Sequence, residues 1–307
     1  PAAQCTRWCN HQCRTPLAQR LKEALVRSIG ILVLFAAAFS ATFAATQEPG
    51  LLSRYDLGTR SLRADLPGRL AEVSGLAITP DGRLFAHDDE RAWVHEIDVE
   101  TGEVGKRFMF GNQTARDDFE GMAIVGERFF LISSGGLLYE SREGADREEM
   151  PYRVTDTGIG RHCEVEGLDY QANWDELLIL CKTSTPDRGT IVLHRLPLDP
   201  DKERRPPIEI SRSLLGAFGL SSDFHGSAVV SDPSAPSLIL VAAREEAMIE
   251  VSEEGQIIAG FKLARRRHAQ AEGLAIGPDG TLFIADEQNG RSARITMYYP
   301  TNPEVSR

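Results

Sequence analysis

Carboxylates and other polar residues recur just before five glycines of this sequence, where they could converge on one site. The five segments are EVSGLAI at Gly75, DFEGMAI at Gly121, EVEGLDY at Gly167, DFHGSAV at Gly226 and QAEGLAI at Gly273. The residues directly before the glycines are Ser74, Glu120, Glu166, His225 and Glu272. Two positions earlier stand Glu72, Asp118, Glu164, Asp223 and Gln270. Residues two apart in an extended chain point to the same side, so the ten side chains would form two polar rings around a common axis.

A ring of this composition has the chemistry of a cation site. Ionised carboxylates that meet near one axis repel one another, so they must be protonated, paired with a base or neutralised by a cation. Donor sets made only of oxygens suit calcium, and we expect calcium as the ion. The predicted ligands are Glu120, Glu166, Glu272, Asp88 and Asp286, with Glu72, Asp118, Glu164, Asp223 and His225 as secondary candidates.

Two alternatives stay open at this point. A buried glutamate at the start of a strand can bond backbone N–H groups of a neighbouring segment and have no other role. His225, the only histidine of the ring, could coordinate a softer metal or act as a hydrogen-bonded spacer. No arrangement for nucleophilic catalysis is recognised, because Ser133-Ser134-Gly135-Gly136 lacks the pattern of a nucleophile elbow.

The elements that position these residues repeat along the chain. The five glycines are separated by 46, 46, 59 and 47 residues, and each precedes two apolar runs joined by a turn. In the first and last copies the turn is Pro-Asp-Gly, in which proline fixes its own φ and glycine accepts a positive φ. Further strands follow in the first copy, which makes a four-stranded antiparallel unit of about 45 residues, the size of a propeller blade.

The repeat predicts an all-β fold, a five-bladed β-propeller of four-stranded antiparallel blades, with six blades as the alternative. Residues 51–67 should supply the outer strand of the last blade and pair with residues 293–300, which closes the ring and removes an exposed edge. The first strands of all blades run the same way along the axis, so their starting ends share one mouth of the channel. The second strands return to it and bring Asp88, Asp89, Glu90, Lys182, Glu245, Asp286 and Glu287.

The N-terminal residues are interpreted separately from the propeller. Basic residues precede an apolar run over residues 29–45 that ends in small residues, which is typical of a secretory signal or an uncleaved signal anchor. We therefore divide the chain into an extension with a signal or anchor, residues 1–45, and a propeller domain, residues 46–307. Cys5, Cys9 and Cys13 fit no defensible zinc spacing and indicate an overextended reading frame rather than a metal site.

The charge of the chain argues against nucleic-acid binding, and its cysteine content bears on its cellular compartment. The chain has a net charge of −11, and its part after residue 44 holds 29 basic and 44 acidic residues, a net of about −15. Such a surface repels nucleic acid and suits cations or basic partners. Only Cys163 and Cys181 remain after the extension. They stand nearly opposite each other across a hairpin, and an exported compartment permits a disulfide between them.

The repeat segments resemble a known family. EVSGLAITPDGRLFAHDDERAWVHEID, DFEGMAIVGERFFLISSGGLLYE, CEVEGLDYQANWDELLILCK and AEGLAIGPDGTLFIADEQN are similar to the SdiA-regulated family of bacterial envelope proteins, over residues 50–300. The family is itself similar to NHL-repeat proteins. The resemblance implies a five-bladed propeller behind a signal or anchor, with calcium reported in the fold and no established reaction.

Two functions are therefore expected from the sequence. The first is an exported, calcium-binding propeller in the periplasm or envelope that binds an envelope protein or a small ligand at the channel mouth. Anchoring to the plasma membrane through residues 29–45 is the alternative to a cleaved signal. The second is a metal-dependent hydrolase of phosphoesters or lactones at the same mouth, with His225 and Asp223, or Glu166, as the acting groups. Related architectures host such chemistry, which is an analogy of fold only.

Overall fold

The structure is a computed structural model that describes residues 50–58, 61–232 and 234–301. The predictions for the signal or anchor at residues 29–45, and for Cys5, Cys9 and Cys13, lie outside these ranges. Within the described ranges, no helix has the length and apolar character needed to cross a membrane.

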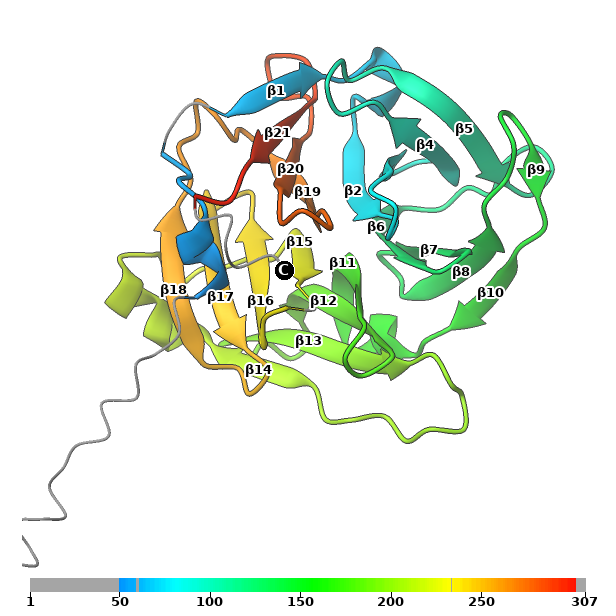
Figure 1. Cartoon of the computed structure of the whole chain (residues 1–307). Coiled ribbons are helices and arrows are strands. Elements are labelled where there is room, and N and C mark those ends of the chain that lie inside the picture. The colour runs from blue at the N-terminus through cyan, green and yellow to red at the C-terminus, as the bar shows by residue number, and fades with distance from the viewer. Residues whose placement is uncertain (1–49, 59–60, 233, 302–307) are drawn as a thin grey trace, which may run out of the picture. The chain divides into compact units, whose positions relative to one another are not determined.

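The apolar runs form five antiparallel sheets arranged as the blades of a propeller, as predicted (Figure 1). Blade 1 contains β2 (Val73–Ile78), β3 (Leu84–Asp88), β4 (Trp93–Ile97) and β5 (Val104–Phe110), with the short β9 (Glu149–Met150) added in parallel to β5. Blade 2 contains β6 (Phe119–Val125), β7 (Arg128–Ser133), β8 (Leu137–Arg142) and β10 (Arg153–Asp156). Blade 3 contains β11 (Cys163–Gln171), β12 (Glu176–Ser184), β13 (Thr190–Pro197) and β14 (Ile208–Ser211). Blade 4 contains β15 (Ala228–Ser231), β16 (Ser237–Ala242), β17 (Ala247–Ser252) and β18 (Ile257–Lys262).

Blade 5 is built from both ends of the described chain, as the sequence predicted. It contains β19 (Ala271–Ile276), β20 (Leu282–Asp286), β21 (Arg294–Tyr298) and β1 (Leu62–Asp65). Leu62 pairs with Met297 and Asp65 with Arg294 in an antiparallel register. The first strand thus fills the edge that the last blade would otherwise expose, a closure that protects propellers from pairing with other chains.

Short 3-10 helices complete the fold between the strands: η1 (Leu51–Arg54), η2 (Gly68–Leu70), η3 (Ile159–Arg161) and η4 (Arg212–Phe218). Apolar clusters fill the spaces between neighbouring blades, and aromatic rings concentrate between blades 1 and 2. There Phe85 and Phe108 each meet Phe129 edge-on, with ring centroids 5.0 and 5.2 Å apart, a favourable geometry for the ring quadrupoles.

The glycines of the repeat lie where the inner strands approach one another most closely. The inner strands follow the order β2, β6, β11, β15 and β19 around the ring, and β19 lies again beside β2 (Figure 1). A Cβ on Gly121 would stand 2.5 Å from the backbone nitrogen of Leu168 in the next blade, and a Cβ on Gly273 would stand 3.2 Å from that of Leu76. The repeat therefore needs glycine for close approach between backbones, since none of the five has a positive φ.

The residue before the glycine forms a β-bulge in four of the five blades. Phe119 pairs with Ser133 and Gly121 with Ile132, so Glu120 is an extra residue without a partner across the hairpin. Ser74, Glu166 and Glu272 stand at the same register shift in blades 1, 3 and 5. Bulges redirect a side chain locally. Here the bulged residue is the one directly before the glycine, which belongs to the polar ring nearest the glycines, called here the inner ring.

The glycine contacts give a direct test of the fold. Gly121→Ala should lower the free energy of unfolding by about 2 kcal/mol, because the added methyl group forces two inner strands apart. Gly105→Ala is the matched control, since a Cβ there meets no atom within 4 Å. Urea denaturation measures both. Equal stability of the two variants would contradict the assigned role of the repeat glycines.

Candidate functional site

Three glutamates of the predicted inner ring share one electrostatic environment at the channel mouth where the inner strands begin, called here the acidic mouth. Burial, followed by the charges of Glu166 and Asp118, raises the pKa of Glu120 to about 9. Burial and the charge of Glu166 also raise the pKa of Glu272 to about 8. The structure thus brings Glu120, Glu166 and Glu272 together, and their raised pKa values show that ionising all three is costly.

Lys182 supplies the counter-charge at this mouth. Its Nζ donates to Glu166 Oε1 at 2.6 Å and lies 3.4 Å from Glu164 Oε1. Burial alone would lower the pKa of Lys182, but the hydrogen bond and charge of Glu166 raise it overall. Burial raises the pKa of Glu166 to about 7, even though Lys182 acts in the opposite direction. One ammonium therefore stands among three glutamates.

The alternative role for these glutamates, in which they only bond backbone N–H groups of a neighbouring blade, finds little support. Across the described residues, no backbone N–H donates a hydrogen bond to the carboxylates of Glu120, Glu166 or Glu272. The bonds that would make these side chains simple braces between blades are thus missing from that part of the chain. The donors that two of them do have are side chains, Lys182 for Glu166 and Gln270 for Glu272.

The carboxylate oxygens of these glutamates are the ligand type that a hard cation takes. They do not, however, surround a common point at coordination distance. In the described part of the chain, one set of three Cys, His, Asp or Glu ligand atoms lies within 4.8 Å of one another, and it comprises Cys163, Cys181 and His194. The three glutamates are more widely spread. Glu120, Glu166 and Glu272 are the residues that could offer carboxylate oxygens to a calcium ion, which takes six to eight oxygen ligands.

Asp88, another predicted ligand, lines a pocket at the side of blade 1. This pocket, of about 280 Å³, is lined by Glu72 and His95 as well. Burial raises the pKa of Asp88 to about 6, and its Oδ1 accepts a hydrogen bond from the backbone of Arg91. The adjacent Asp89 has a raised pKa through burial and the charges of Glu72 and Asp118, among others. These acids extend the negative charge of the acidic mouth over blade 1.

Asp286 is held by partners that the sequence did not indicate. Its Oδ2 lies 2.8 Å from His268 Nδ1, and its Oδ1 accepts from the backbone of Gln270 at 3.3 Å. The other ring nitrogen of His268 lies 2.8 Å from the hydroxyl of Tyr298. All three side chains are buried. Asp286 thus ends a buried Asp–His–Tyr chain in blade 5, and Glu287, its neighbour, contributes to the charge around Glu272.

His225 is clamped by Glu245 rather than by Asp223. Glu245 accepts from the His225 backbone at 2.9 Å through one oxygen, and its other oxygen lies 2.8 Å from His225 Nδ1. Asp223 is exposed. The secondary candidates Asp118 and Glu164 act on the glutamates through their charges.

Cys163 and Cys181 are joined in a disulfide between β11 and β12. His194, on β13, was not indicated by the sequence, and its ring approaches the two sulfurs. Burial lowers the pKa of His194, so the ring is kept neutral beside the disulfide. To predict from the sequence that His194 lies near the disulfide, one would have to know the register of β12 against β13, in which Ile179 pairs with His194.

The opposite end of the channel has a different chemistry. A cavity of about 570 Å³ is lined by the finishing ends of the inner strands, including Ile78, Ile124, Tyr170, Val230 and Ile276. Its polar groups include Asp169, which accepts from the backbone and hydroxyl of Ser231 at 2.7 and 2.6 Å. The channel thus has an acidic mouth and an apolar mouth.

Comparison with solved structures identifies the architecture. The fold is similar to glutaminyl cyclase of Myxococcus xanthus, with a TM-score of 0.54 and 15% identity over 77% of this chain and 93% of that chain. The likeness is one of fold. Virginiamycin B lyase of Staphylococcus aureus aligns with a TM-score of 0.43 and 11% identity, over 77% of this chain and 69% of that chain. The PQQ-bound aldose sugar dehydrogenase of Streptomyces coelicolor aligns with a TM-score of 0.43 and 13% identity, over 78% of this chain and 96% of that chain.

No protein-family profile matches the sequence, and no curated protein matches it. The comparisons therefore support a β-propeller and leave its activity to be argued from the residues of this chain.

The acidic mouth makes stability depend on pH in a defined direction. An unfolded glutamate ionises near its ordinary pKa, so the folded protein retains an extra proton on Glu120 from there up to about pH 9. The free energy of unfolding therefore falls as pH rises through this range. With a chelator present, Glu120→Gln should be more stable than the wild type at pH 8, by at least about 1 kcal/mol, and similar to it at pH 4.

Denaturation curves at the two pH values measure this difference. Glu127→Gln removes the same charge from an exposed turn and serves as the control. A stability gain of Glu120→Gln that is independent of pH would contradict the assignment of a raised pKa.

Proposed function

We propose that the acidic mouth binds a cation, with calcium as the preferred ion, and that the protein is an exported binding or scaffolding module of the bacterial cell envelope. The observation that carries this proposal is a set of three glutamates with raised pKa values, of which Glu166 is buried and Glu120 and Glu272 are half-buried. Burial is the main cause of these shifts, neighbouring carboxylates add to it, and Lys182 is the base that pairs with Glu166. A bound divalent ion would remove the repulsion that keeps these groups protonated.

The choice of calcium follows from the donor atoms. The mouth offers carboxylate oxygens from three bulged glutamates, and further acids surround them. Hard cations such as calcium take oxygen ligands, whereas structural zinc takes cysteine and histidine. When bound, the ion would supply positive charge that acceptor oxygens of a ligand or partner could contact at the channel mouth.

The location in the envelope rests on the sequence and on one feature of the fold. The apolar run at residues 29–45 has the character of a signal or anchor. The Cys163–Cys181 disulfide is of the kind that persists in oxidising compartments. Together with the motifs similar to the SdiA-regulated family, these features support export to the periplasm or envelope.

Calorimetric titration of the full chain with calcium, after treatment with a chelator, tests the cation proposal. The wild type should bind with measurable heat and gain thermal stability, and Glu120→Gln or Glu272→Gln should weaken binding at least tenfold. Lys182→Gln should strengthen it, because it removes the ammonium that competes for Glu166. The control Glu127→Gln should bind like the wild type.

The Lys182 variant separates an ion at this mouth from an ion elsewhere. Calcium binding that does not respond to Lys182→Gln or to either glutamine variant would place the ion at another site. Absence of both heat and thermal shift in the wild type would overturn the proposal.

A second candidate, hydrolysis of a phosphoester or lactone, is favoured by the fixed pair of His225 and Glu245. A histidine oriented by a carboxylate is a common general base, and Glu166 is a second group able to carry a proton near neutral pH. A panel of phosphoester and lactone substrates, assayed with calcium, should show turnover that His225→Asn or Glu166→Gln abolishes. If no substrate reacts faster than in a calcium-only blank, the protein is a binding module without this activity.

A further inference from the structure

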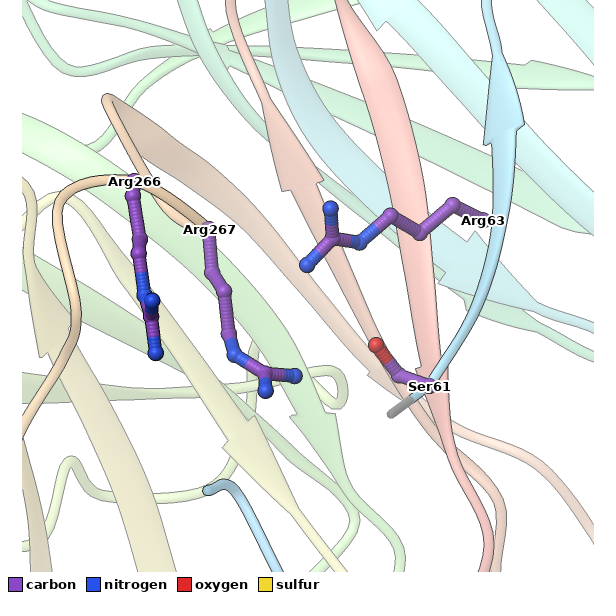
Figure 2. Close-up of a pocket in the computed structure, with 4 residues that line it drawn as sticks. All are labelled: Ser61, Arg63, Arg266 and Arg267. Atoms are coloured by element: carbon purple, nitrogen blue, oxygen red, sulfur yellow. The ribbon is translucent and has the colours of Figure 1, made fainter. Parts of the chain in front are cut away.

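Three arginines converge on a pocket at the rim of blade 5, away from the glutamates discussed above. The pocket has a volume of about 440 Å³ and is lined by Ser61, Arg63, Arg266 and Arg267. Arg63 lies on β1, whereas Arg266 and Arg267 lie on the loop between β18 and β19. Figure 2 shows the guanidinium of Arg63 pointing across the pocket toward Arg267, with the Ser61 hydroxyl between the two segments.

Two of these arginines, Arg63 and Arg266, meet no acid among the residues that line the pocket. In the described part of the chain, no carboxylate forms an ion pair with Arg63 or Arg266. Arg267 donates to the backbone carbonyl of Gly58 at 2.6 Å. The whole chain carries a net charge of −11, so a locally positive pocket is not the result of a basic composition. Like charges held together repel one another, and a bound anion would relieve that repulsion.

The loop that carries two of the arginines is braced from beneath. His268, which follows Arg267, is buried and joins Asp286 to the hydroxyl of Tyr298 on β21. Arg291 donates to the backbone carbonyls of Arg266 and Arg265 at 2.7 and 3.2 Å. The same strand β21 pairs with β1, which carries Arg63. The buried Asp–His–Tyr chain thus connects the two segments that face each other across the pocket.

Tyr298, at the end of the Asp–His–Tyr chain, is within electrostatic reach of two of the arginines. Burial raises the pKa of Tyr298, while the charges of Arg267 and Arg63 act to lower it. The arginine charges therefore reach the tyrosine hydroxyl that His268 holds. A preorganised cluster of guanidiniums and a hydroxyl costs little to arrange when a ligand arrives.

We propose that this pocket binds a phosphate group carried by a larger molecule. Guanidinium groups present paired N–H donors that match phosphate oxygens, and three of them with a serine hydroxyl suit a group with two charges and several acceptor oxygens. Arg63 and Arg266 are exposed, so the remainder of the ligand can extend outward. A soluble phosphorylated molecule and a lipid headgroup present the same chemistry.

Calorimetric titration of the full chain with inorganic phosphate tests the site. The wild type should bind phosphate, and Arg63→Met or Arg266→Met should weaken binding at least fivefold each. Both side chains are exposed, so the variants should keep the fold, which circular dichroism checks. Arg188→Met removes the same charge from an exposed loop of blade 3 and should bind like the wild type. No phosphate binding by the wild type, or an equal loss in Arg188→Met, would overturn the proposal.

Vesicle sedimentation distinguishes the two sources of phosphate. For a lipid headgroup, vesicles of phosphatidylcholine with phosphatidic acid should retain the wild type better than Arg63→Met, whereas pure phosphatidylcholine vesicles should not distinguish them. For a soluble ligand, phosphate binding should depend on Arg63, but the wild type and Arg63→Met should sediment equally with both types of vesicle. These measurements are independent of calcium, so their outcome does not depend on the proposed cation site.

Discussion

The close approach of five inner strands around one axis is the constraint on which the rest of the structure depends. Backbone atoms of neighbouring blades meet at Gly121 and Gly273 at distances that leave no room for a side chain. This contact sets the width of the channel. It also explains why the residue before each glycine matters, because in four blades it is the bulged residue at the beginning of the strand. A packing requirement at one position thus brings the glutamates that precede it into one small volume.

The same arrangement gives the channel two unlike ends. All inner strands run in one direction, so everything that precedes a glycine collects at one mouth and everything that follows the apolar run collects at the other. The first mouth holds Glu120, Glu166 and Glu272 with Lys182, and the second holds the apolar cavity. One end thus gathers carboxyl groups, whereas the other is lined mainly by apolar side chains.

The sequence contained enough information to predict the closed ring of five blades, but not which polar side chains would pair with one another. Spacing of the glycine motifs predicted five blades and the pairing of residues near 62 with residues near 297, because both follow from strand length and closure. The partner of each polar residue could not be read in this way. Lys182 reaches Glu166 because two register shifts in one hairpin bring them together. Asp286 is hydrogen-bonded to His268, and Glu245 to His225. Both contacts depend on the direction of the side chains, which the repeat pattern does not reveal.

The closing strand has a consequence for how the chain must assemble. β1 is among the first strands to be synthesised, yet its pairing partner β21 is the last. Until β21 arrives, β1 is an unpaired edge and the ring stays open, with the most non-local strand pairing of the fold still to form. Formation of blade 5 is thus a late event that joins both termini of the propeller. A chain threaded across a membrane N-terminus first would have to emerge almost entirely before its ring could close.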